Sequence, residues 1–208
     1  MPSRISLRDG EESAREAAAG LVLGTQKLVD QHLLAFEAAS GALSDGTKNS
    51  LLLEPVFLGS AHLIIVARKV TNAQGVGSRE HLGAFVAAFD AKLLFYLALV
   101  FDVLPEPVAD EDHAEVKFVE PHGYDTVRRE YLQWSVVRRE QYQGAYSSFG
   151  LRVRRLLHGP THTAALILNE LLRRSFAEDQ VPPPYPQIAA FTADVLANVE
   201  ELAKRLSP

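Results

Sequence analysis

Apolar residues recur every three or four positions over most of the chain, and this spacing constrains the fold more than any other feature. Residues 78–103 show it most strongly. The apolar positions there are Leu82, Phe85, Phe89, Leu93, Tyr96, Leu97 and Val100. A helix turns once in 3.6 residues, so this spacing gathers the apolar side chains on one face, whereas a half-buried strand needs strict alternation. The sequence therefore predicts an all-α fold.

Proline, glycine and clusters of small polar residues divide the chain into the expected helices. The expected ranges are 11–40, 55–72, 78–103, a fourth helix from about 125, 160–176 and 186–206. Pro55 is placed at the start of the second helix, because proline is tolerated in a first turn. Gly144 and Gly150 weaken a continuation of the fourth helix to Leu157. Five or six helices in one bundle, forming a single all-α domain over residues 1–208, are the expected architecture.

Residues 104–124 interrupt the helical pattern and are expected to form one irregular acidic loop. Three prolines exclude a continuous helix there. Seven acids lie from Asp102 to Glu120, against the single Lys117. The segment AEVKFVE alternates between apolar and polar residues, which predicts one short strand. A connection of this length is typically either mobile or functional.

Composition narrows the compartment and the kinds of site. The 208 residues include no cysteine, so disulfides and thiolate sites are excluded, and the N-terminal segment has no apolar run typical of a secretory signal. We therefore expect a cytoplasmic protein. Residues 82–101 are interrupted by Asp90 and Lys92, which favours a buried helix at the centre of the bundle over a membrane span. The sequence contains neither a glycine-rich phosphate loop nor a nucleophile elbow.

Arginine is concentrated in residues 125–175. This stretch holds nine arginines, four acids and no lysine, a local charge of +5 in a chain whose net charge is −5. The arginines are 128, 129, 138, 139, 152, 154, 155, 173 and 174. Guanidinium groups bind phosphates and carboxylates bidentately. One hypothesis is a face that binds an anionic ligand (a nucleotide, an RNA phosphate or an acidic partner) through Arg138, Arg139, Arg154 and Arg155. The alternative is that the arginines pair with the acidic loop or solvate outer helix faces.

Arg152 and His158 form an R-x5-H motif immediately before an apolar helical segment, THTAALILNELL. This arrangement resembles the HEPN helical ribonucleases, in which such a motif precedes a late helix of an α-bundle. The resemblance covers about 25 residues, and Val153 stands where that family usually has a polar residue. It implies a metal-independent ribonuclease in which two protomers face one RNA. Arg152 would then bind the scissile phosphate, and His158 would transfer protons, as an imidazole can near neutral pH.

His158 and His162 are four residues apart, a spacing that allows two histidines on one helix face to bind a metal ion. The pair resembles the H-x3-H element of DinB-type helical-bundle enzymes, which implies a histidine-bound metal and hydrolase or transferase chemistry. Pro160 lies between the two histidines and argues against one continuous helix through both. No cofactor is identified by the motifs.

Two further expectations concern Asp90 and assembly. Asp90 lies at the edge of the apolar face of residues 78–103, and its candidate partners are Lys92, Arg68 or an arginine of the fourth helix. A carboxylate buried without a partner would be costly. The helices at 78–103 and 160–176 together carry more apolar surface than one small core is expected to bury, so a homo-oligomer, such as a homodimer, is predicted.

Overall fold

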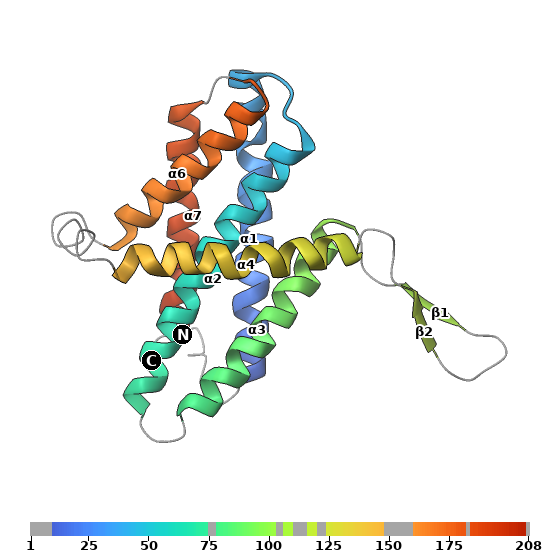
Figure 1. Ribbon diagram of the computed structural model, residues 1–208, viewed down its shortest axis with the longest axis vertical. Coiled ribbons are helices and arrows are strands. Elements are labelled where there is room, and N and C mark those ends of the chain that lie inside the picture. The colour runs from blue at the N-terminus through green and yellow to red at the C-terminus, as the bar shows by residue number, and fades with distance from the viewer. Residues whose placement is uncertain are drawn as a thin grey trace.

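A computed structural model describes residues 10–74, 78–102, 106–109, 116–119, 124–147, 160–181 and 184–206. These residues form an all-α bundle with one small hairpin, which confirms the expected fold class (Figure 1). The helices are α1 (Gly10–Ser40), α2 (Asp45–Gln74), α3 (Ser78–Val100), α4 (Tyr124–Ser147), α6 (Pro160–Glu178) and α7 (Tyr185–Leu206). The strands are β1 (Glu106–Ala109) and β2 (Val116–Val119). Apart from α2, the helices begin within about two residues of the positions expected from capping and proline signals.

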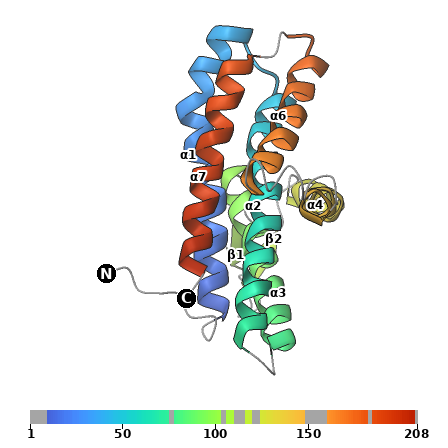
Figure 2. The ribbon, with the colours of Figure 1, turned by 90° about the vertical axis from the view of Figure 1, so that its left-hand side faces the viewer.

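The antiparallel helices α1 and α7 lie side by side along the length of the bundle (Figure 2). The buried face of α7 repeats at helical spacing, with Phe191, Val195, Val199, Leu202 and Leu206 each under a tenth exposed. Near one end, His32 and Phe36 of α1 meet Phe191 of α7 edge to face. α1 ends at Gly41, whose φ of 87° is the left-handed conformation that glycine adopts readily after a helix.

The start of α2 corrects the expected boundary. The helix begins at Asp45 rather than near Pro55, so Pro55 lies inside it. The polar cluster before Leu51 is a helix cap rather than a loop, because Ser44 Oγ accepts the Thr47 backbone N–H at 3.1 Å. Leu51 and Leu52 are then buried, so tertiary packing outweighs the lost hydrogen bond at the proline.

The centre of the bundle is α2 and not α3, as had been expected. α2 contacts α1, α3, α4, α6 and α7, and most of its residues from Leu51 to Ala61 are buried. Among the described elements, α3 packs mainly against α1, α2 and α4 and lies at the edge of the bundle. Phe95 and Leu99 of α3 are 47% and 44% exposed, so the prediction of a helix buried all round was wrong.

The acidic connection contains an antiparallel two-stranded hairpin. Strand β2 lies in the segment expected to form one, and β1 supplies its partner, with Pro107 opposite Phe118 and Ala109 opposite Val116. Among the described elements the hairpin strands contact each other and no helix closely, and the hairpin projects from the bundle (Figure 1).

Two helical segments, 45–73 and 80–100, are long and apolar enough to cross a membrane by length and composition. The segment in α2 is 72% buried inside the bundle, which is typical of a core helix. In α3 only 28% of the corresponding window is buried, and Phe95 and Leu99 are among its exposed side chains.

Candidate functional site

Helix α4 crosses the bundle and attaches to it through a polar stripe. Its inward positions are Tyr131, Ser135, Arg138, Arg139 and Tyr142, spaced as one face of a helix. Val136 and Val137, on the outer side, are 57% and 43% exposed. α4 is seen end-on, outside α2, in Figure 2. We call these five inward residues the α4 polar stripe.

Arg139 is the centre of this contact. Its two terminal nitrogens bind the Asp90 carboxylate of α3, one of them at 3.1 Å and the other in a shorter ion pair. Its Nε donates to Ser60 Oγ of α2 at 2.9 Å, and Nη2 lies 2.7 Å from the Tyr131 hydroxyl. One guanidinium therefore joins α2, α3 and α4. This finding identifies the partner of Asp90 as an arginine of α4 rather than Lys92.

Arg138 makes a second ion pair beside the first. Its Nε donates to Glu54 Oε1 of α2 at 2.9 Å, and the two side chains are 20% and 11% exposed. Tyr142, on the next turn of α4, also acts on Glu54 and lowers the pKa of its carboxyl group. Two neighbouring arginines thus hold carboxylates from two different helices, and this arrangement sets where α4 lies.

Burial governs the electrostatics of the stripe. Burial raises the pKa of Glu54 above its ordinary value, although Arg138 and Tyr142 act in the opposite direction. Burial also raises the pKa of Tyr131 well above its usual range. For Arg139, burial alone would lower the pKa, but hydrogen bonds and charge from Asp90 and Tyr131 leave it raised. Arg139 therefore stays a cation, and its charge is neutralised inside the molecule.

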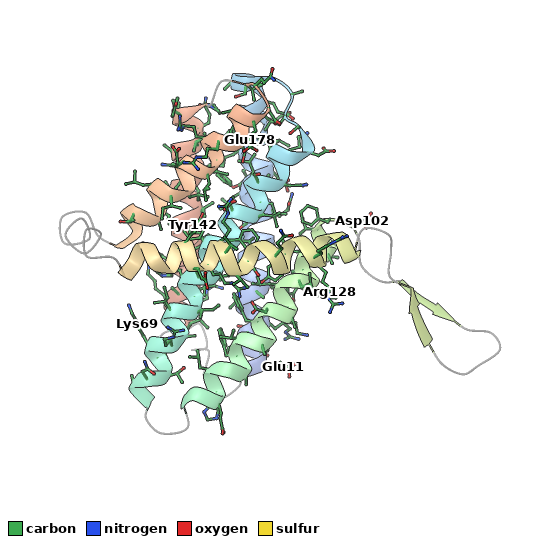
Figure 3. All side chains as sticks on the ribbon, in the orientation of Figure 1. Glu11, Lys69, Asp102, Arg128, Tyr142 and Glu178 are labelled. Atoms are coloured by element: carbon green, nitrogen blue, oxygen red, sulfur yellow. The ribbon has the colours of Figure 1, made fainter. Side chains whose placement is uncertain are left out.

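The remaining described arginines of residues 125–175 fall into two groups. Arg173 and Arg174 of α6 both bind Glu170, and those hydrogen bonds lower the pKa of Glu170 to about 2. Arg128 and Arg129 are exposed near the start of α4, away from Tyr142 (Figure 3). Ser147 is the last residue of α4, and at 1.5 Å per residue it lies about 27 Å along the helix from Arg129. The described arginines of residues 125–175 therefore do not form one compact patch. The predicted pairing with the acidic loop lies outside the described side chains, because those of residues 103–127 are not among them.

Several predicted site residues lie outside the described part of the chain. Residues 148–159 include Arg152, Arg154, Arg155 and His158. His162 lies in the first turn of α6, which begins at Pro160 as expected, although its side chain is not among those described. The helix start falls between the two histidines, so His158 precedes the helix that carries His162.

The described histidines are engaged in other contacts. His32 of α1 lies 2.8 Å from Asp194 of α7, a partner distant in sequence. Burial and the charge of Lys69 lower the pKa of His62, while Glu200 opposes that shift. Within the described residues, no group of three His, Asp or Glu side chains is arranged to hold a metal ion.

Sequence reasoning missed Glu54 and Ser60 as partners of the α4 arginines. A usable signal was the spacing of Tyr131, Ser135 and Arg138–Arg139, which puts polar groups on a single helix face. An inward polar face requires buried polar partners elsewhere. Glu54 and Ser60, within the apolar stretch of α2, were the available ones.

No protein-family model matches the chain, and no curated protein or solved structure is significantly similar to it.

Proposed function

We propose that the protein binds a phosphate-bearing anionic ligand through Arg152, Arg154 and Arg155. The supporting observation is that four arginines elsewhere in residues 125–175 are already paired with carboxylates. Arg138 and Arg139 are each paired with a carboxylate, Glu54 and Asp90, and Arg173 and Arg174 share the single carboxylate of Glu170. Residues 141–169 contain the arginine triplet and two histidines but no acid. Positive charge without a nearby acid in the sequence is therefore concentrated there, and it attracts phosphate or acidic groups.

Binding to a labelled single-stranded RNA is the direct test. Neutralising three phosphates releases counterions, so affinity is expected to fall about 15- to 20-fold between 50 and 200 mM salt. Replacing Arg152, Arg154 and Arg155 together by Gln should abolish binding. In the matched control, Arg173→Gln with Arg174→Gln removes two charges already paired with Glu170 and should change affinity little. Salt-independent binding, or equal losses in both variants, would contradict the proposal.

A second candidate is the ribonuclease activity that the R-x5-H resemblance implies. It is favoured by the start of α6 at Pro160, two residues after His158, because that resemblance requires a helix directly after the motif. His158→Ala should then reduce RNA cleavage roughly 10²- to 10⁴-fold while RNA affinity changes little. His162→Ala, outside the motif, should have a smaller effect. RNA that stays intact from about pH 5 to about pH 9, with and without divalent ions, would reject this candidate but leave the binding proposal standing.

A further inference from the structure

Helix α3 carries a long exposed face without charged residues. We define the α3 outer face as Gly83, Ala84, Ala87, Ala91, Phe95 and Leu99, all of which are exposed. It extends over about 24 Å of helix at 1.5 Å per residue. A side-chain carbon at Gly83 would meet nothing within 4 Å, so the described part of the chain leaves that end of the face open.

Side-chain size is graded along this face. The first half contains glycine and alanine only, and the second half contains Phe95 and Leu99. If two such helices pack antiparallel with Ala91 at the two-fold axis, Ala87 lies opposite Phe95 and Gly83 lies opposite Leu99. Each large side chain then meets a small one. A two-fold interface has to be complementary to itself, and this face has that property.

We propose that a second copy of the chain docks on the α3 outer face in this antiparallel arrangement. The hairpin supports a second copy as the occupant. An isolated two-stranded hairpin is only marginally stable in water, and β1 and β2 contact no described helix closely. The hairpin extends from the side of the bundle on which α3 lies (Figure 1). A contact between two α3 helices alone would bury less than the roughly 800 Å² per partner of a standard interface. The hairpin is placed to add area to that contact.

The composition of the face favours a protein partner over a lipid surface. Glycine and alanine expose little apolar area to gain from lipid, but they let two helices approach closely. Membrane-surface helices typically combine large apolar residues with Lys and Arg along the polar side. α3 carries only two cationic residues, Arg79 in its first turn and Lys92, in a chain of net charge −5. An anionic membrane would repel such a chain.

This pairing differs from the one that the HEPN resemblance implies. Helix α6 begins on the side of the bundle opposite to α3 and the hairpin (Figure 1). Two copies joined through α3 would therefore hold the N-terminal ends of their α6 helices apart rather than facing one RNA. The proposal is independent of the anion-binding proposal, since it uses none of the same residues.

The absence of cysteine allows a position-specific test in the full chain. Ala91→Cys introduces one thiol at the predicted axis, where closely packed helices bring the two Cα atoms within about 4–6 Å, suitable for a disulfide. Mild oxidation should convert most of this variant to a covalent dimer. Leu34→Cys on α1, where the native side chain is 78% exposed, is the control. The Leu34→Cys variant should cross-link far less. Random collisions alone would give the opposite result, because they favour the more exposed thiol.

Light scattering measures the same interface without cross-linking. The unmodified chain should show twice 22.9 kDa at tens of micromolar. Ala87→Glu should give the single mass with its helix content retained, whereas Leu34→Glu should remain a dimer. A monomeric unmodified chain, a dimer unaffected by Ala87→Glu, or no preferential cross-link at Ala91 would overturn the proposal. So would binding of a monomer to phosphatidylcholine vesicles that Ala87→Glu abolishes, which would identify a lipid surface as the occupant.

Discussion

Glu54 and Asp179 are carboxylates whose environments shift their pKa values in opposite directions. Burial in α2 raises the pKa of Glu54, even though Arg138 lies beside it. Asp179, after the end of α6, accepts hydrogen bonds from Ser44 and Thr47, which lower its pKa. The same functional group thus responds to desolvation at one site and to donated hydrogen bonds at the other.

These two shifts predict opposite dependences of stability on pH. A raised pKa in the folded state contributes stability that is present below the ordinary value of 4.5 and is lost as pH rises through the folded pKa. The stability of the unmodified chain relative to Glu54→Gln should therefore decrease as pH rises above that value. Relative to Asp179→Asn, it should instead increase as pH rises through the lowered pKa toward the ordinary value of 3.8. Urea unfolding across this acid range measures both differences. A relative stability that rises with pH for Glu54 would mean that the Arg138 ion pair outweighs burial.

At the scale of single residues, the candidate site was partly predictable. The cost of an unpaired buried charge led to an arginine of the fourth helix as one candidate partner for Asp90, and Arg139 is that partner. The choice among Lys92, Arg68 and these arginines depends on where α4 crosses α3, which helical periodicity does not specify. The pairing of Arg138 with Glu54 depends on the same crossing.

At the scale of elements, caps and prolines predicted most boundaries, and α2 shows why one failed. Pro55 was assigned to a first turn because that position costs a helix least. Leu51 and Leu52 are buried in the core, and Ser44 caps the helix ten residues before the position expected. Burial of two leucines outweighs one lost hydrogen bond, and only the packed structure shows that both are buried.

Gly59 in α2 and Gly83 in α3 form a matched pair for testing helix packing. A Cβ at Gly59 would overlap Leu21 of α1 and lie 3.1 Å from Val199 Cγ2 of α7. Gly59→Ala is therefore expected to destabilise the fold by about 1–3 kcal/mol, despite the better helix propensity of alanine. Gly83→Ala meets open space and should be neutral or stabilising by up to about 1 kcal/mol. Urea unfolding of both variants at one protein concentration is the measurement. Equal effects would show that α1, α2 and α7 do not approach one another as closely as described.

For the whole molecule, the all-α class followed from apolar periodicity, but the order of the helices within the bundle did not. α3 is the more uniformly apolar helix, yet α2 lies at the centre and α3 at the edge. Periodicity identifies which face of a helix is buried, not how many neighbours surround it. A helix that is apolar on several faces is compatible with a central position and with an interface between chains.

The pairing of α1 with α7 has a consequence for synthesis. These helices are joined by contacts such as that of His32 with Asp194, which are 162 residues apart in the chain. While a ribosome is still making the middle of the protein, α1 is present without α7, whose Phe191 packs against Phe36. Native packing of this first helix therefore waits until α7 has left the exit tunnel. Through that interval the nascent chain exposes an apolar face to chaperones and to neighbouring chains on the same messenger RNA.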